Sequence, residues 1–507
     1  MSSTFEILQE IGRRIHLLTH INALLGWDQE VYMPDGAVSE RAEQLSYIEG
    51  LLYDESISKE LGDALREMGA SEERPRGREG LNDQESAHVR ILYNAYRKQT
   101  KLPKSLVMDT AREISIAQNK WAEARRKDDF SLFEPHLRRL LELTAEKIEK
   151  LGYSEHPYDA LLDDFEPGTT TADIQPVFAR LREGLKDIVQ RIAAVEQVDG
   201  SFITRSYDTV KQEQFGRDVL EAIGYDFTRG RLDISTHPFT TTLGMDDVRI
   251  TTRYNEHFFN TGIFGIIHEA GHALYELGFS EEIRGGILAD GTSLGIHESQ
   301  SRMWENLVGR SYAFWKRYYS ELQALFPDSL NDIGLDQFYR GINKVEPSFI
   351  RVEADEVTYN LHIILRFELE LALITGELAV QDLPDAWNSK FTDFFGITPP
   401  TAAEGVLQDI HWSMGAYGYF PTYALGNLYS AQFFTAMKRE MPNIDDKIAN
   451  GNFPDILNWL RKNIHSSGST YTAEEICRKV CGKTLDPEIF LTYIGEKFGA
   501  VYDLSGG

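Results

Sequence analysis

The stretch FGIIHEAGHALYELG, residues 264–278, carries two histidines four positions apart, with a glutamate directly after the first. The apolar residues around them predict a largely buried helix. Residues four apart share one face of a helix, so His268 and His272 can direct an imidazole nitrogen at a single point, as two ligands of a zinc-like ion must. Glu269 projects beside them, where a carboxylate can accept a proton from an attacking water. The stretch therefore predicts a metal site with Glu269 as general base.

A hydrolytic zinc needs a third protein ligand and an open position. The segment GIHESQSRMWENLVGR, residues 295–310, runs from a loop into an amphipathic pattern, and it places Glu298 near the first turn of a predicted helix. His297 competes for the same role, but it lies on a different face of that helix. Helix geometry favours Glu298 as the third ligand.

The predicted donor set indicates a type of chemistry. A divalent ion held by two neutral imidazoles and one carboxylate keeps a net positive charge, lowers the pKa of its water and polarises a carbonyl group, so amide hydrolysis is the natural reaction. The tetrahedral oxyanion needs further donors. Candidates lie on a glycine-rich stretch that we expect to be an irregular loop, residues 408–426: His411, Tyr417, Tyr419 and Tyr423. For each tyrosine, simple packing is the alternative role.

Helical periodicity dominates the whole chain, which predicts a mainly α fold. One segment departs from it: in residues 231–256, β-branched residues cluster and Val248 and Ile250 alternate with polar neighbours, which predicts a small sheet or hairpin beside the histidine-bearing helix. Without repeats or low-complexity tracts, we expect residues 1–507 to form one helical domain with a deep cleft between two lobes. The predicted helices span 5–25, 40–68, 84–127, 130–151, 172–197, 209–223, 261–277, 298–326, 353–379, 429–438 and 485–498.

Charge and cysteine content exclude several classes of protein. The 507 residues include 52 Lys and Arg against 79 Asp and Glu, a formal charge of -27 that repels nucleic acids and anionic membranes. We find neither a signal peptide nor an apolar run near the roughly 20 residues that span a bilayer. The two cysteines, Cys477 and Cys481, lie one helical turn apart and provide no disulfide framework. We therefore expect a soluble cytoplasmic protein with two inert thiols.

Several motifs follow one another along the chain after the opening stretch LLGWDQEVYMP (24–34). The motifs are HPF (237–239), DVRIT (247–251), HEAGH (268–272), HESQSR (297–302), IRVEAD (350–355) and GVLQDIHW (405–412). Together they resemble the carboxypeptidase Taq family of metallocarboxypeptidases, and they occur in the family's order. The resemblance covers at least residues 24–425.

The resemblance implies a helical, cleft-bearing fold related to angiotensin-converting enzyme and the oligopeptidases, with the small sheet near the active site and assembly as a homodimer. It also implies removal of C-terminal amino acids from peptides with broad specificity, with zinc or cobalt as the working ion. It favours Glu298 over His297 as the third ligand.

A carboxypeptidase must hold the free carboxylate of its substrate, and the planar fork of an arginine does so with two hydrogen bonds. Arg351 and Arg249 lie in the family motifs. We expect Arg351 to anchor the carboxylate and Arg249 to assist it or to act structurally. His237 is expected to line the substrate pocket, while Asp247 and Asp355 are expected to fix the geometry of the cleft.

Two other functions remain compatible with the sequence. An oligopeptidase would cut internal bonds with the same metal site, in a cleft that neither arginine reaches. A non-catalytic helical scaffold would use the metal structurally, but such a site has no use for a carboxylate like Glu269 beside an open position.

Overall fold

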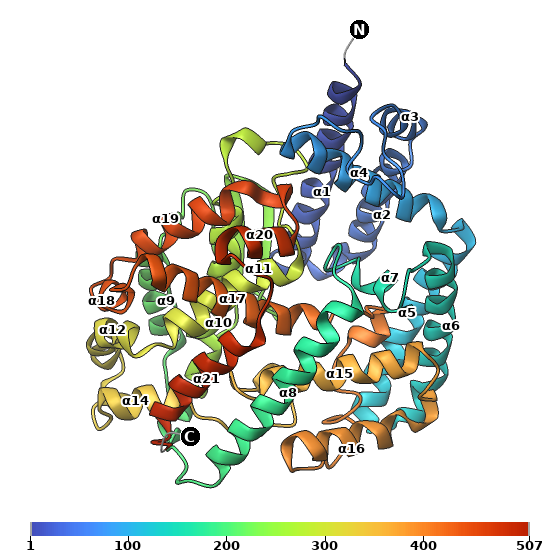
Figure 1. Cartoon of the computed structure of the whole chain (residues 1–507). Helices are drawn as coiled ribbons and strands as arrows, with labels where there is room; N and C mark the ends of the chain where they lie inside the picture. The colour runs from blue at the N-terminus through green and yellow to red at the C-terminus, as the bar shows by residue number, and fades with distance from the viewer. Residues whose placement is uncertain (1–2, 505–507) are drawn as a thin grey trace. The chain divides into compact units, whose positions relative to one another are not determined.

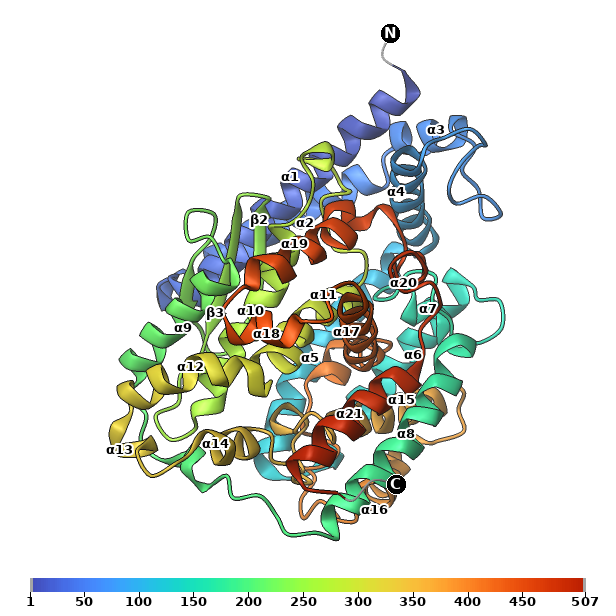
Figure 2. The same cartoon turned by 60° about the vertical axis from the view of Figure 1, so that its left-hand side comes forward.

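Helices form most of the chain in the computed structural model, which describes residues 3–504 (Figures 1 and 2). The predicted mainly α class is confirmed. The chain divides into two units: unit 1 comprises residues up to 100 together with 200–342 and 433–484, and unit 2 comprises 101–199, 343–432 and the residues from 485 onward. The predicted cleft between two lobes of a single domain stays a prediction.

The N-terminal part of unit 1 is a layer of helices. Helix α1 (Thr4–Val31) begins at a capping box, in which the Ser3 hydroxyl accepts from the Glu6 amide and the Glu6 carboxylate accepts from the Ser3 amide. It packs against α2 (Val38–Ser56) and α3 (Lys59–Glu67), and both views show α1 and α2 side by side. The core between these helices contains Leu8, Ile11, Leu61 and Leu65.

The predicted small sheet is present and has three strands. Strand β3 (Asp247–Thr252) is central, with β1 (Leu232–Ile234) parallel on one side and β2 (Thr240–Gly244) antiparallel on the other. Val248 and Ile250 are fully buried, as their alternation predicts. The sheet packs against α10 (Phe259–Glu276), so it flanks the histidine-bearing helix as expected.

The helix predicted over 298–326 is wrong in its start and its continuity. Helix α11 (Leu294–Arg302) begins four residues earlier, because the Ser293 hydroxyl caps it by accepting from the Ile296 amide at 3.1 Å. The chain then widens into a π-helix, η5 (Met303–Gly309), and α12 (Tyr312–Leu325) starts anew behind the cap of Ser311. Glu298 therefore lies in the second turn of its helix and not in the first.

Unit 2 is built from long helices that pack in pairs. Figures 1 and 2 show α8 (Thr171–Ala193) beside α21 (Pro487–Val501), and these two helices are in contact. Helix α15 (Tyr359–Ile374) packs on α8 and is buried on most sides. The unit also contains α5 (Lys104–Lys127), α6 (Glu134–Leu151), α7 (Asp159–Leu162) and α16 (Leu383–Phe395).

Other predicted boundaries shift for local reasons. The span 40–68 divides at Ser58, which caps α3, and the span 84–127 divides at Pro103, which cannot continue a helix. Helix α17 (Pro421–Glu440) starts eight residues before the predicted 429, so it includes Tyr423. The remaining helices are α4 (Asp83–Lys101), α9 (Thr209–Ile223), α13 (Pro327–Leu330), α14 (Leu335–Ile342), α18 (Ile444–Ala449), α19 (Phe453–Asn463) and α20 (Ala473–Cys481).

Two further findings concern the chain as a whole. Across residues 3–504, no helix combines the length and the apolar character that crossing a membrane requires. Cys477 and Cys481 both lie on α20 and are buried.

Candidate metal centre

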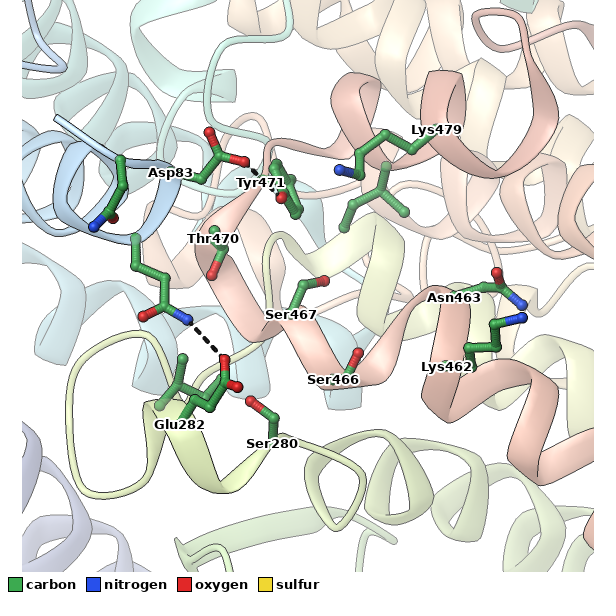
Figure 3. A pocket seen from close by; sticks show the side chains of 14 residues that line it. Asp83, Ser280, Glu282, Lys462, Asn463, Ser466, Ser467, Thr470, Tyr471 and Lys479 are labelled. Atoms are coloured by element: carbon green, nitrogen blue, oxygen red, sulfur yellow. Dashed lines mark hydrogen bonds between the residues drawn. The ribbon is translucent and has the colours of Figure 1, made fainter. Parts of the chain in front are cut away.

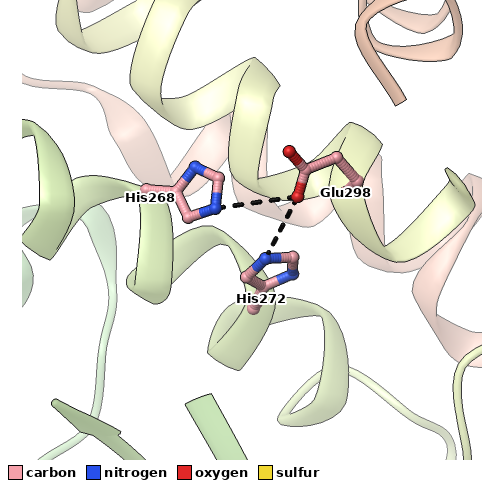
Figure 4. Close-up of side chains that lie close together, drawn as sticks. All are labelled: His268, His272 and Glu298. Carbon is pink, nitrogen blue, oxygen red and sulfur yellow. Dashed lines mark ion pairs between the residues drawn. The ribbon is translucent and has the colours of Figure 1, made fainter. Parts of the chain in front are cut away.

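Three side chains of α10 and α11 meet at one point in unit 1. Nε2 of His268 lies 3.6 Å from Oε2 of Glu298, and Nε2 of His272 lies 3.4 Å from the same oxygen (Figure 4). All three ligand atoms lie within 4.8 Å of one another. A tetrahedral zinc with bonds of about 2.1 Å separates its ligand atoms by roughly 3.4 Å, so the donors fit one such ion. The structure thus brings together the three residues predicted as ligands.

A glycine lets the two helices approach closely enough for this arrangement. Gly271 lies between the two histidines on α10, and a β-carbon placed on it would stand 2.5 Å from Cα of Ser301 and 2.6 Å from the carbonyl oxygen of Gln300. Real β-carbons do not approach a backbone so closely, because packed interiors are already at close contact. Gly271 therefore sets the distance from which Glu298 reaches the histidines.

The second ring nitrogen of His268 is held by a carboxylate. Its Nδ1 lies 2.9 Å from Oε2 of Glu305, which projects from the π-helix. Burial raises the pKa of Glu305, but the Arg302 guanidinium and the hydrogen bond with His268 outweigh it and lower that pKa to about 2. An ionised carboxylate only accepts, so Nδ1 of His268 carries the proton and Nε2 keeps the lone pair that a metal needs.

The second ring nitrogen of His272 is held by His297. The two Nδ1 atoms are 2.6 Å apart, and Nε2 of His297 lies 2.7 Å from Oε1 of Glu276. If Glu276 accepts from His297, the Nδ1 of His297 is free to accept from His272, whose Nε2 then faces Glu298. His297, the competing ligand candidate, lies outside the three-residue group and behind one of its members.

The charge states of the group suit metal binding. Burial lowers the pKa of His272 to about 3, so its imidazole is neutral at neutral pH. Burial alone would raise the pKa of Glu298, but the Arg302 guanidinium and the two histidines hold it well below its usual range. Burial would lower the pKa of His268, but the Glu298 and Glu305 carboxylates raise it above its usual value, so an ion at this site competes with a proton for Nε2 of His268. With that proton displaced, two imidazoles and one carboxylate are donors that zinc and cobalt accept.

Glu269 lies beside the ligands on α10 and is nearly buried, at 7% exposure. Its Oε2 accepts a hydrogen bond of 2.7 Å from the hydroxyl of Thr240, the first residue of β2. Burial raises the pKa of Glu269 above its usual value, although His268 and the Thr240 hydroxyl oppose this. A carboxylate whose pKa lies nearer neutrality is better able to accept and return a proton.

A second cluster of predicted residues lies in unit 2 around the partly buried carboxylate of Asp409. Nε of Arg351 donates to Oδ1 of Asp409 at 3.0 Å, and Nε of Arg366 donates to Oδ2 of Asp409 at 2.7 Å. Nη1 of Arg351 also donates to the hydroxyl of Tyr359 at 3.1 Å. Two guanidinium groups thus share one carboxylate, which leaves an excess positive charge in a buried place.

The predicted oxyanion donors belong to this second cluster. The ring centroid of His411 lies 5.3 Å from that of Tyr419, and Tyr423 lies under the Arg351 guanidinium, 5.0 Å from ring centroid to Cζ. Burial lowers the pKa of His411 to about 4, so it is neutral at neutral pH. Tyr417 is only 1% exposed, which suits packing better than contact with a substrate. Tyr423 lies on α17 and not on the expected loop.

Of the remaining predicted residues, Arg249, Asp247 and His237 lie in unit 1 and Asp355 lies in unit 2. Arg249 makes two hydrogen bonds to Asp247, of 2.8 and 2.7 Å, and its guanidinium lies 4.2 Å from the ring centroid of Trp27. His237 is exposed in the short segment between β1 and β2. The carboxylate of Asp355 accepts from the amides of Val357 and Thr358, so it holds the backbone just before α15.

A surface pocket of unit 1 is lined by residues other than those of the metal centre. Figure 3 shows Tyr471 hydrogen-bonded to Asp83 on one side of it and Lys479 beside the Tyr471 ring, with Nζ 3.8 Å from the ring centroid. None of its lining residues is a predicted metal ligand or substrate-binding residue. The pocket therefore contributes nothing to the metal centre.

Four residues that contact the proposed ligands, the proposed base or His297 were not predicted from the sequence. Arg302 and Glu305 follow Glu298 by four and seven residues, a spacing that places all three on one helix face and could have been recognised. Thr240 and Glu276 carry no such signal. Thr240 reaches Glu269 only through the packing of β2 on α10.

Comparisons with known proteins show the family to which the chain belongs. The family model described as carboxypeptidase Taq (M32) metallopeptidase matches residues 7–498. Thermostable carboxypeptidase 1 of Thermus thermophilus is 43% identical over 511 residues, covering 99% of both chains, and carboxypeptidase 1 of Bacillus subtilis is 41% identical over 497 residues, covering 97% of both. The crystal structure of an M32 carboxypeptidase from Deinococcus radiodurans is 36% identical, with a TM-score of 0.95, and the match covers 99% of this chain and 100% of that one.

Proposed function

The chain belongs to the carboxypeptidase Taq (M32) family of metallopeptidases, and from this we propose that His268, His272 and Glu298 hold its metal ion and that Glu269 is its general base. As a member of that family, the protein is a metal-dependent carboxypeptidase that acts on peptides. The observation that carries the proposed site is the convergence of two Nε2 atoms on one carboxylate oxygen, at 3.6 and 3.4 Å.

Each group of the proposed site has its own role in hydrolysis. A bound divalent ion supplies Lewis acidity, which polarises the substrate carbonyl and makes an attacking water more acidic. Glu269 accepts the proton of that water and returns it to the leaving amine, and the Thr240 hydroxyl holds the carboxylate in place for both steps. The near-complete burial of Glu269 keeps bulk water from competing for the proton.

Substrate binding is assigned to the other predicted residues. Arg351 binds the C-terminal carboxylate of the peptide, a role that the two guanidinium groups on one Asp409 carboxylate support, because an anion would balance the excess charge. His411, Tyr419 and Tyr423 serve as donors to the oxyanion. Arg249, which is already paired with Asp247, assists Arg351 in binding the carboxylate or has a structural role. His237 contacts the substrate.

The finer properties of the enzyme follow the family. We assign it zinc, with cobalt as the alternative, because both accept this set of nitrogen and oxygen donors. We further assign it broad specificity for peptides with a free C-terminus, assembly as a homodimer and a cytoplasmic location. Its formal charge of -27 supports the absence of nucleic acid and membrane partners.

Product analysis tests the proposed function. The zinc-loaded protein is incubated with a mixture of peptides, and the products are identified by mass. We expect ladders that shorten by one C-terminal residue at a time, whereas internal fragments would indicate an oligopeptidase.

A Glu269→Gln variant serves to test the base. It should keep its metal and lose about 10²- to 10⁴-fold in turnover, the usual contribution of a general base. Turnover close to that of the unmodified protein would exclude Glu269 from this role.

A further inference from the structure

Arg302 lies between two carboxylates, that of the buried proposed metal ligand Glu298 and that of the partly buried Glu305. Its Nε donates to Oε1 of Glu298 at 2.6 Å, and its Nη1 lies 3.3 Å from Oε2 of Glu305. The same Oε2 of Glu305 lies 2.9 Å from Nδ1 of His268. Hydrogen bonds therefore connect two proposed ligands to each other through atoms that are not directed at the metal.

Glu305 is fixed from its other side as well. Nη2 of Arg310 lies 3.3 Å from Oε1 of Glu305. Arg310 is itself anchored, because its Nη1 donates to the carbonyl oxygen of Ile342 at 2.8 Å and its guanidinium lies 3.7 Å from the ring centroid of Phe264. Both oxygens of Glu305 thus have cationic partners, and the carboxylate has little freedom to turn.

This network determines which atoms remain for a metal. Because Arg302 occupies Oε1 of Glu298, only Oε2 faces the Nε2 atoms of His268 and His272. Because Glu305 accepts from Nδ1 of His268, the ring is held in one orientation with Nε2 free. Both effects hold the ligand atoms in place before any ion arrives.

We propose that Glu305 is a positioning residue for the metal ligand His268, and that Arg302 connects it to the ligand Glu298 so that the two helices present one preorganised site. This inference rests on the proposed metal site. It adds that metal affinity depends on residues that do not touch the ion. Outer partners of this kind typically change metal affinity by about 10- to 100-fold when they are removed.

A simpler explanation is that Glu305 contributes only negative charge near the cation. The two explanations differ for Glu305→Asp, which keeps the charge but has a side chain one methylene shorter. If Glu305 positions His268, the shorter side chain cannot restore the hydrogen bond, and affinity stays low. If charge alone matters, affinity returns to that of the unmodified protein.

The test is the dissociation constant for zinc, measured on the full chain by competition with a chromophoric chelator. For Glu305→Gln we expect binding about 10- to 100-fold weaker. The matched control is Glu368→Gln in unit 2, whose carboxylate also has two cationic partners, Arg182 and Lys390, but contacts no histidine of the site. This control should bind zinc as the unmodified protein does.

A second variant keeps the test decisive if Glu305→Gln does not fold, which circular dichroism of the metal-free protein would reveal. Arg302→Lys retains the charge but replaces the planar fork with a single ammonium group, which cannot hold both carboxylates in the same geometry. We expect weaker zinc binding in this variant too. Unchanged affinity in Glu305→Gln, or in Arg302→Lys where the former cannot be studied, would overturn the inference, as would full recovery in Glu305→Asp.

His268→Ala separates this inference from the proposed function. If His268→Ala abolishes zinc binding while Glu305→Gln leaves it unchanged, the metal site stands and only the positioning role fails. If His268→Ala binds zinc as tightly as the unmodified protein, the site itself is misassigned, and both proposals fail together.

Discussion

A β-carbon on Gly271 would lie 2.5 Å from Cα of Ser301, so α10 and α11 are in backbone contact at the metal centre. The contact occurs between the two histidines of one helix and just after the glutamate of the other. The distance between the two helices therefore determines whether Glu298 reaches the two histidines.

The first prediction concerns this contact. In Gly271→Ala the added methyl group must push α11 away from α10, because the atoms it meets are backbone atoms that cannot rotate aside. We expect a loss of about 1 to 3 kcal/mol in unfolding free energy, typical of overpacking, together with weaker zinc binding. Denaturant titration and chelator competition measure the two effects.

Gly265 on the same helix supplies the control. A β-carbon there would meet only Oγ1 of Thr252, at 3.9 Å, an ordinary contact distance. Gly265→Ala should keep its zinc affinity and gain up to about 1 kcal/mol from better helix propensity. Equal zinc affinity in the two variants would mean that the helix contact does not control the site.

The second prediction concerns His297, which the structure places behind His272 and not in the ligand group. His297→Ala removes the partner of Nδ1 of His272 and should weaken zinc binding by about 10- to 100-fold, the range for an outer partner. His272→Ala removes a ligand and should cost far more. Similar losses in both variants, measured by chelator competition, would instead identify His297 as a ligand.

The third prediction concerns Arg351. If it binds the substrate carboxylate, Arg351→Ala should reduce kcat/KM much more for a peptide with a free C-terminus than for the same peptide with a C-terminal amide. A hydrogen bond to a charged group contributes about 1.5 to 3 kcal/mol, which corresponds to roughly 10- to 100-fold. Equal losses on the two peptides would leave Arg351 with a structural role only.

The fourth prediction concerns Glu370, a fully buried carboxylate on α15 that accepts from the Tyr158 hydroxyl, the Trp412 indole and the Gly418 amide. Burial raises the pKa of Glu370 from 4.5 to about 7, despite these donors. The folded protein then binds the proton more tightly than the unfolded chain does. The stabilisation by protonation is complete below about pH 4.5 and is lost as the pH rises to about 7.

A pKa difference of this size corresponds to about 3 kcal/mol at most. Denaturant titrations between pH 5 and pH 8 should show a decline in unfolding free energy that is smaller in Glu370→Gln, which cannot titrate. Parallel pH profiles in the two proteins would show that Glu370 stays ionised in the fold, held by its three donors.

The three proposed metal ligands could be selected from the sequence because their signal is local. His268 and His272 follow from helical spacing alone, and Glu298 follows from an amphipathic segment shortly downstream. The same spacing argument could have added Arg302 and Glu305. The mainly α class and the small sheet also follow from local periodicity, of period 3.6 and 2.

The remaining partners could not be predicted, because they depend on tertiary contacts between distant segments. Asp409 joins Arg351, 58 residues earlier, to Arg366, 43 residues earlier. No periodicity connects these three positions. The predicted helix boundaries were wrong for a different reason. Ser293 and Ser58 each cap the start of a helix, and a single serine is a weak signal in the sequence.

All three proposed ligands lie on consecutive helices of unit 1, with no contribution from unit 2. By mass action, an ion that binds only the folded site adds RT ln(1 + [M]/Kd) to the stability of the structure that forms it, about 2.7 kcal/mol when the free ion is at 100 times its Kd. That increment stabilises the folded structure that forms the site. Chelation should therefore lower the melting temperature of the metal-loaded protein, and the shift should grow with the free-ion concentration that chelation removes.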